Sequence, residues 1–401
     1  MSSNAPRAAL LGAFDRFNYG DLLFPIVARN EIRAHQGTVA DDAYALVASD
    51  LSRYGALPTR SLRDMYRDLK AGDAVIFAGG GTVGVDWYFM LSNLLGPQGN
   101  KLLAALPRVI GYRMTERLCR NYFGARAPFP WVAGPQDFPV PVNVAYNAVG
   151  GSELGTHPAA AREATLQRLA QAAYLSVRDT ETQRVFSPVE DRVKVHVSPD
   201  SAILMSEQFP VPWLREHASR DTLAVLDETP YLCFHANQGY INRHKAQIVE
   251  ALHATYEAHR LPVVLLPIGR YHGLDDHLGL TDLQRELKIP SRMVSSEANL
   301  WEIMLSVAQS QLFLGTSLHG AVTSQSFGVP HLGLSERVHK LDYYLGTWDL
   351  PEQADCVKLR DVPDRVTRAL AVSAERRQDK RQELIRLAHE NFARLMTACR
   401  L

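Results

Sequence analysis

His319 is the residue whose type and position most clearly allow chemistry. It follows the short apolar run 311–315, and small and apolar residues recur at helical spacing after it until Gly328 and Pro330. This pattern predicts a strand, a turn and a helix. In an open α/β sheet, such a unit places the turn at the ligand crevice, beside helix N-terminal N–H groups that favour anions. A histidine there can transfer a proton near neutral pH, and a purely structural role is the alternative.

Two other groups of polar residues also follow apolar runs. Arg178 stands at the end of one such run, and a guanidinium suits the planar oxygens of a carboxylate or phosphate. Asn18, Gly20 and Asp21 follow the run Ala8–Phe14 and precede a helical pattern. They supply a turn residue, a flexible backbone and an acid that either caps the helix or assists a substrate hydroxyl.

A glycine triplet follows the apolar run Asp73–Ala78 and comprises Gly79, Gly80 and Gly81. Three glycines after a strand let the backbone approach another object closely. No Lys-Ser/Thr follows, so this is not a P-loop, and it is a weak dinucleotide fingerprint. The triplet therefore serves either ligand contact or packing.

Composition restricts the classes of partner. The chain has 401 residues, with 43 Lys plus Arg and 43 Asp plus Glu. A balanced charge gives no reason to expect nucleic acid as a partner, so any anion site must be local. Neither a secretory signal nor a run of about 18 apolar residues is present, which predicts a cytoplasmic protein without an integral membrane segment. Four widely spaced cysteines lack metal-ligand spacing, so we expect no metal site.

The elements that would position these residues alternate between strand and helix patterns. In the first half, strands are predicted at Ala8–Phe14, Tyr44–Ala48, Asp73–Ala78, Trp131–Gly134, Asn143–Gly150 and Tyr174–Asp179. In the second half, they are predicted at Tyr231–His235, Val263–Ile268, Ser291–Val294, 311–315 and Pro330–Leu334. Helical patterns between them predict two mostly parallel, doubly wound Rossmann-like domains that face each other across a cleft. The expected boundaries are 1–205 for the first domain, 206–230 for a linker, 231–361 for the second domain and 362–401 for a C-terminal helix.

The assembled motifs resemble the polysaccharide pyruvyl transferase family over most of the chain. The matching pieces are Asn18-Tyr-Gly-Asp21, Asp73-Ala-Val-Ile-Phe-Ala-Gly-Gly-Gly81, Ser176-Val-Arg-Asp179, Ser198-Pro-Asp200 and Ser317-Leu-His319 followed by Gly328-Val-Pro330. The resemblance implies a glycosyltransferase-B-like fold. It also implies transfer of pyruvate from phosphoenolpyruvate, a substrate rather than a cofactor, onto sugar hydroxyls as a ketal. The acceptor would be a cell-surface polysaccharide or a precursor of exopolysaccharide or capsule.

The resemblance implies roles for individual residues. His319 would be the general acid, with Asp21 as a second catalytic residue, and the first domain would hold the acceptor through Asn18, Gly80 and Gly81. Arg178 and Ser317 would bind the donor. The family's Arg-Leu-His motif falls on Ser317, so that an arginine is missing and another cation must reach the donor. Arg270, which follows a predicted strand, and Arg337 and Lys340 are the candidates.

Other functions remain open at this point. A nucleotide-sugar-dependent glycosyltransferase of the same architecture would use the same cleft. A non-catalytic sugar-binding protein could keep the fold after losing the arginine at position 317. The acceptor could be lipid-linked or nucleotide-linked, and a lipid-linked one would be compatible with peripheral membrane association.

Overall fold

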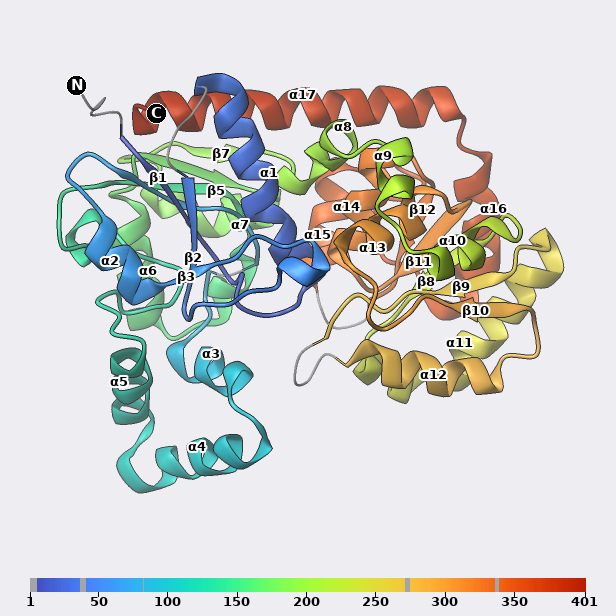
Figure 1. Cartoon of the computed structure of the whole chain (residues 1–401), viewed down its shortest axis with the longest axis horizontal. Coiled ribbons are helices and arrows are strands. Elements are labelled where there is room, and N and C mark those ends of the chain that lie inside the picture. Colours follow the sequence, from blue (N-terminus) through green and yellow to red (C-terminus); the bar gives the residue numbers. More distant parts are fainter. Residues whose placement is uncertain (1–5, 37–40, 82, 271–274, 336–338) are drawn as a thin grey trace.

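The computed structural model describes residues 6–36, 41–81, 83–270, 275–335 and 339–401. In these ranges the chain forms two α/β domains, each built around one parallel sheet (Figure 1). A cavity lined by residues of both domains lies between them. The predicted fold class of two Rossmann-like domains is therefore confirmed.

The N-terminal domain contains the larger sheet. Its strands are all parallel and lie in the order β3 (Arg60–Ser61), β2 (Asp41–Ala45), β1 (Ala8–Leu11), β4 (Ala74–Phe77), β5 (Asn143–Val149), β6 (Tyr174–Val177) and β7 (Val195–Val197). Successive residues of a strand point to opposite faces, and both faces are buried here. Leu10 and Ile76 therefore pack in one hydrophobic cluster, while Leu11 and Phe77 pack in another on the opposite face.

The C-terminal domain contains a smaller parallel sheet. Its strands lie in the order β10 (Ser291–Met293), β9 (Val263–Leu265), β8 (Leu232–His235), β11 (Leu312–Gly315) and β12 (His331–Gly333). The helices of the whole chain are α1 (Tyr19–Gln36), α2 (Leu62–Asp68), α3 (Trp87–Leu94), α4 (Pro97–Ile110), α5 (Tyr112–Tyr122), α6 (Ala159–Leu169), α7 (Thr180–Phe186), α8 (Met205–Gln208), α9 (Val211–Glu216), α10 (Arg220–Asp227), α11 (Gln238–His259), α12 (Asp276–Glu286), α13 (Leu300–Ala308), α14 (Leu318–Phe327), α15 (His339–Trp348), α16 (Val362–Ala371) and α17 (Ala374–Cys399). Within the described ranges, no helix combines the length and the apolar character needed to cross a bilayer.

One local prediction was wrong, and one segment differs in form from what its composition suggested. The segment Trp131–Gly134 is not a strand and makes only an isolated bridge from Val132 to Phe129. Prolines at 128, 130 and 135 surround it and cannot donate to a sheet ladder, so the buried Trp131 marks a core loop instead. The expected linker at 206–230 is largely helical, because it contains α9, α10 and most of α8.

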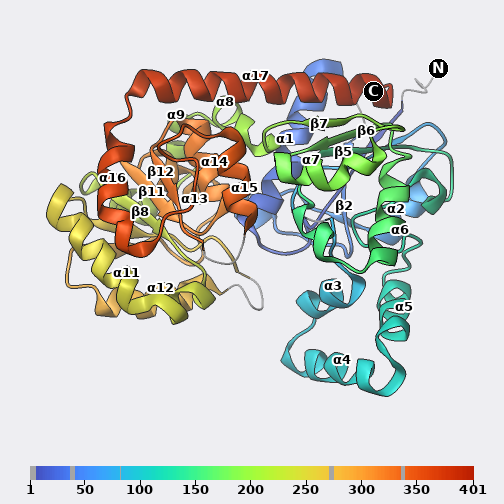
Figure 2. The ribbon, with the colours of Figure 1, turned by 180° about the vertical axis from the view of Figure 1, so that it is seen from behind.

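Helices α3, α4 and α5 form a projection from the N-terminal domain (Figures 1 and 2). Trp87 attaches the projection to the domain, since its Nε1 donates to the Pro128 carbonyl over 2.9 Å. The Glu116 carboxylate of α5 accepts hydrogen bonds from the backbone N–H groups of Trp87 and Tyr88, at 3.1 and 2.6 Å. The projection is thus an ordered part of the fold that extends away from both sheets.

Helix α17 joins the two domains from outside. Figure 2 shows it running along one side of the molecule, across both of them. At its N-terminal end, Arg377 donates to the Gly328 carbonyl at the end of α14 over 2.9 Å. Further along, the buried Asn391 accepts from the Tyr174 hydroxyl over 2.7 Å and donates to Asn147 over 2.6 Å. The helix predicted for 362–401 therefore divides into α16 and α17, and α17 packs over the first domain.

The Asn391 hydrogen bonds give a test of this packing. Replacing Asn391 with alanine removes the hydrogen bonds that α17 makes to the buried Tyr174 hydroxyl and to the Asn147 side chain. Each unsatisfied group reduces stability by about 1–3 kcal/mol. We expect urea unfolding, followed by tryptophan fluorescence, to occur at clearly lower denaturant in Asn391→Ala. The control is Arg386→Ala, which removes an exposed ion pair with Glu390 and should change stability by less than about 1 kcal/mol. Equal midpoints for the two variants would contradict this view of α17.

Candidate active site

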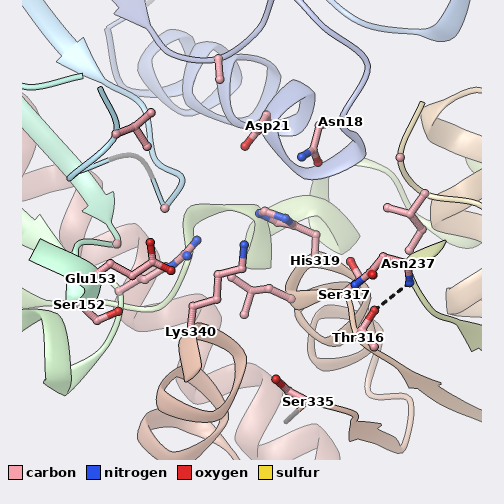
Figure 3. Close-up of a pocket in the computed structure, with 18 of the residues that line it drawn as sticks. Asn18, Asp21, Ser152, Glu153, Asn237, Thr316, Ser317, His319, Ser335 and Lys340 are labelled. Carbon is pink, nitrogen blue, oxygen red and sulfur yellow. Dashed lines mark hydrogen bonds between the residues drawn. The ribbon is translucent and has the colours of Figure 1, made fainter. Parts of the chain in front are cut away.

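A cavity of about 430 Å³ lies between the domains and collects residues from both. The carboxyl ends of the parallel strands of each sheet point toward it, as expected for ligand sites in α/β folds. From the N-terminal domain it is lined by the start of α1 and by the loops after β4, β5 and β6. From the C-terminal domain it is lined by the loops after β8, β11 and β12 (Figure 3).

His319 lies in the first turn of α14, directly after strand β11. The Ser317 side chain caps this helix by accepting a hydrogen bond from the Gly320 N–H over 3.1 Å. The imidazole packs against the first turn of α1 in the other domain. A Cβ added to Gly20 would lie only 1.8 Å from His319 Nδ1, and the Phe24 ring meets the imidazole edge-on at 5.3 Å between centroids. The contact therefore requires glycine at position 20.

The surroundings of His319 disfavour its charged form. Its Nε2 lies 3.8 Å from Asp200 Oδ2 and has no hydrogen-bond partner among the described residues. Burial, with the positive charges of Arg178 and Lys340, lowers the pKa of His319 to about 4, although Asp200 opposes this change. In the free protein the imidazole is thus neutral at neutral pH.

Arg178 is almost completely buried at the end of β6. It forms an ion pair with the buried Asp200, at 3.3 Å between Nη1 and Oδ2. Glycines leave room for it, because a Cβ at Gly81 or Gly150 would lie 2.9 or 2.8 Å from the guanidinium. Its Nε–H has no partner in the described part of the chain. One donor of a buried guanidinium is therefore left without a partner next to the cavity.

Lys340 extends from α15 into the same cavity, and Figure 3 shows its amine directed toward the centre of the site. The cavity leaves this residue open to solvent, yet the surrounding protein and the Arg178 charge lower the pKa of Lys340. Asp21 and Glu153 oppose that change. The site thus contains cationic groups close enough to repel each other, which favours binding of an anion.

Asp21 lies in the first turn of α1 rather than at its cap. The preceding Asn18 has the capping role, since its Oδ1 accepts from the Gly20 N–H over 3.3 Å. Burial, together with the Asp200 charge, raises the pKa of Asp21 to about 6, although Arg16, Lys340 and Arg178 oppose this change. A carboxyl group with this pKa can exchange a proton near neutral pH.

The structure brings most of the predicted site residues together. Those that line the cavity are Asn18, Asp21, Gly81, Arg178, Ser317, His319 and Lys340. Gly80 is not among the lining residues. Its carbonyl accepts from the Gly150 N–H over 2.8 Å, so it extends the pairing of β4 with β5.

Arg270 also lies outside the lining of the cavity. Its guanidinium stacks on the rings of Phe17 and Tyr54, at 4.1 and 4.8 Å from their centroids, and donates to the Ala298 carbonyl. This placement does not support the predicted donor contact and gives Arg270 a role in joining the domains. Arg337 falls outside the described residues.

Several lining residues were not assigned a role from sequence. Asp200 does not line the cavity but belongs to a quoted motif, and only its burial beside Arg178 reveals its electrostatic role. Asn237 follows β8, and that position at a strand end was a signal that could have identified it. His235 pairs with Asp276 over 3.1 Å, and Asp276 also accepts from the Gly269 N–H over 2.7 Å. No local sequence pattern links these two residues.

The comparisons with known proteins agree with this architecture. UDP-GlcNAc 2-epimerase from Neisseria meningitidis has a TM-score of 0.55 and 11% identity, covering 98% of this chain and 99% of the other. The same enzyme from Methanocaldococcus jannaschii has a TM-score of 0.53 and 12% identity, covering 92% and 94%. These identities establish a shared glycosyltransferase-B-type fold and nothing about function.

In the described ranges, no group of three His, Cys, Asp or Glu side chains is arranged to hold a metal ion.

The sequence comparisons show the family to which the chain belongs. Among curated proteins no match is found. The family model of polysaccharide pyruvyl transferase matches residues 18–337, which include every side chain described above for the cavity except Arg16 and Lys340. The chain therefore belongs to the polysaccharide pyruvyl transferase family.

Proposed function

We propose that the protein transfers pyruvate from phosphoenolpyruvate onto two hydroxyl groups of a saccharide, as a ketal, with release of phosphate. The observation that supports this most strongly is a pair of cations in the cavity. Arg178 and Lys340 converge there on His319 and Asp21, whose pKa values are about 4 and about 6. The acceptor would be a cell-surface polysaccharide or its precursor, modified in the cytoplasm.

The donor would be held by its charges. Phosphoenolpyruvate carries about three negative charges, from its carboxylate and its phosphate. We assign these to Lys340, to the Arg178 guanidinium and to the N-terminus of α14, whose first residues line the cavity. In this arrangement Lys340 supplies the charge that the family's arginine would bring at position 317. Ser317 instead caps α14.

The reaction needs one proton on carbon and one on phosphate. The methylene carbon of the donor gains a proton and becomes the methyl group, the central carbon forms two C–O bonds to the acceptor, and its bond to the phosphate oxygen breaks. The two acceptor hydroxyls supply both protons, so the atoms balance. We assign delivery of the carbon proton to His319 and removal of a hydroxyl proton to Asp21, which is ionised above about pH 6.

A general acid must be protonated before it reacts, so His319 can fill this role only if the bound donor raises its low pKa. In the free protein the imidazole is neutral, because burial and two nearby cations disfavour its charge. A bound trianion would offset the charges of Arg178 and Lys340 and raise the pKa of His319. The donor would in this way create the acid that protonates it. Asn18 and Gly81, on the side of the N-terminal domain, are the proposed acceptor contacts.

Binding of the donor can be tested on the two predicted cations. We expect Lys340→Ala to weaken phosphoenolpyruvate binding by about 10- to 100-fold, the range for loss of a charged hydrogen bond. The matched variant Arg270→Ala, outside the cavity lining, should bind the donor within about twofold of the parent, given the same fold. Isothermal titration calorimetry measures both. Suppose that Lys340→Ala binds phosphoenolpyruvate as tightly as the parent does, and that the parent binds a UDP- or GDP-sugar more tightly than phosphoenolpyruvate. The glycosyltransferase function then becomes the better proposal.

The role of His319 can be tested directly and through its neighbour. His319→Ala should lower kcat by about 10²- to 10⁴-fold, as expected for loss of a general acid. Gly20→Ala should have a comparable effect, because the added methyl group would occupy the position of the imidazole. The control is Gly96→Ala, where nothing lies within 4 Å of the added Cβ. Unchanged kcat in His319→Ala, with an unchanged melting temperature, would remove this assignment.

The proposed rise of the His319 pKa predicts proton uptake. Because the pKa starts from about 4, donor binding that raises it should take up protons from solution and should tighten as the pH falls. Calorimetric titrations in two buffers of different ionisation enthalpy measure the number of protons taken up. His319→Asn should take up fewer protons than the parent, and Asp21→Asn shows what Asp21 contributes. Equal uptake in the parent and in His319→Asn would mean that the imidazole stays neutral in the complex.

A further inference from the structure

The projection formed by α3, α4 and α5 has an unusual surface for part of a folded domain. Of the nine large hydrophobic side chains exposed in the described part of the chain, eight belong to this segment. They are Phe89, Leu102, Val109, Ile110, Tyr112, Met114, Leu118 and Tyr122. Such a concentration of exposed apolar side chains marks an interaction surface rather than the scatter found on any protein.

The exposed apolar residues follow the helical repeat. On α4, Leu102 and Val109 are seven residues apart, and their exposed fractions are 75% and 78%. On α5, Met114, Leu118 and Tyr122 recur every four residues and share one face. Thr115 and Cys119 of α5, and Phe123 directly after it, are buried in the domain core. The projection is therefore held by one face and presents a second apolar face to solvent.

Positive charge accompanies this apolar face. Helices α4 and α5 carry five basic residues and one acidic residue, although the whole chain is balanced at 43 of each sign. The acidic residue, Glu116, accepts hydrogen bonds from two backbone N–H groups of α3. Lys101, Arg108, Arg113 and Arg117 make no ion pair with any described residue. Their charges are thus available to an anionic partner.

We propose that this projection docks on an anionic lipid bilayer. Helices that combine exposed Leu, Val, Met and aromatic side chains with Lys and Arg bind at the boundary between headgroups and acyl chains. The basic residues would attract the anionic headgroups, and the apolar residues would enter the boundary region. A second copy of the chain fits less well, since the cores of protein interfaces are depleted of charged residues. Nucleic acid would use the arginines but gains little from exposed aliphatic side chains.

The position of the projection relates the bilayer to the cavity. Phe89, Met90 and Asn93 of α3 line the interdomain cavity, and α3 belongs to the projection. A bilayer bound by α4 and α5 would therefore lie on the side of the protein where α3 opens into the site. A saccharide acceptor carried on a membrane lipid would enter from that side, an extension that rests on the proposed function. Docking itself does not depend on any catalytic residue.

The test is co-sedimentation with vesicles. The full chain should sediment with vesicles of phosphatidylcholine mixed with phosphatidylglycerol, should bind pure phosphatidylcholine weakly, and should dissociate as salt is raised. Arg113→Ala combined with Arg117→Ala should lower the partition coefficient by about 30-fold, since each basic side chain near an anionic surface contributes about fivefold. Leu102→Gln combined with Val109→Gln should lower it by about tenfold or more, because the apolar contacts are lost.

Matched controls separate docking from general effects. Leu278→Gln changes the ninth exposed hydrophobic residue, which lies on α12 of the other domain, and Arg220→Ala changes an exposed arginine on α10. Both should sediment like the parent, and all variants should keep its melting temperature. His319→Ala should bind vesicles normally, which keeps this test independent of the proposed reaction.

Two outcomes would overturn the proposal. Equal sedimentation of the parent and of both projection variants would show that the vesicles bind elsewhere. Failure to bind anionic vesicles, together with a dimer that dilutes to monomer more readily in Leu102→Gln/Val109→Gln under light scattering, would assign the surface to self-association.

Discussion

The arrangement of the site depends on the contact between the first turn of α1 and the first turn of α14. Each helix begins at the end of a strand in a different domain, and Gly20 of one lies against the His319 ring of the other. Any side chain at position 20 would separate them. Because the contact is this close, the N-termini of two helices and the polar residues beside them face one cavity. The hydrophobic cluster that includes Leu23, Ala321 and Phe392 extends across the same junction and packs the two domains against each other.

Closing the domains in this way has an electrostatic consequence. Arg178 and Lys340 come from different domains, and each lowers the pKa of His319 in addition to burial. Arg178 also lowers the pKa of Lys340, so these two positive charges lie close together in the free cavity, although Asp21 and Glu153 partly offset the effect on Lys340. Burial of like charges is unfavourable until an opposite charge enters. Under the proposed function, an anionic ligand would relieve this repulsion, and its binding would be coupled to the protonation state of His319.

The projection shows the same separation between local and overall charge. A balanced sequence total conceals a basic, apolar surface at α4 and α5, next to a cavity whose lining includes α3. In both places the partner is indicated by a few residues that the fold brings together. Net charge describes the solution behaviour of the chain, whereas recognition depends on where the charges lie.

The sequence by itself determined the alternation of strands and helices, the two parallel sheets and the turn that carries His319. Those features depend on local periodicity and on glycine, proline and capping residues, which act over a few positions. It also placed Asn18, Asp21, Arg178 and Lys340 near strand ends, where they indeed line the cavity. It did not predict that Trp131–Gly134 is a loop, because a short apolar run in a buried loop has the same sequence pattern as a buried strand. It also did not predict the helices of the 206–230 segment.

Only the tertiary structure decided which cation reaches the cavity and what state the histidine has. Arg270 and Lys340 both follow strands in the sequence, but Arg270 stacks on Phe17 and Tyr54 while Lys340 extends into the cavity. The pKa of His319 depends on Arg178 and Asp200, which lie more than a hundred positions earlier in the chain. Such differences arise from distances across the domain interface. Burial and Coulomb interactions act through space, and no local pattern of residues records them.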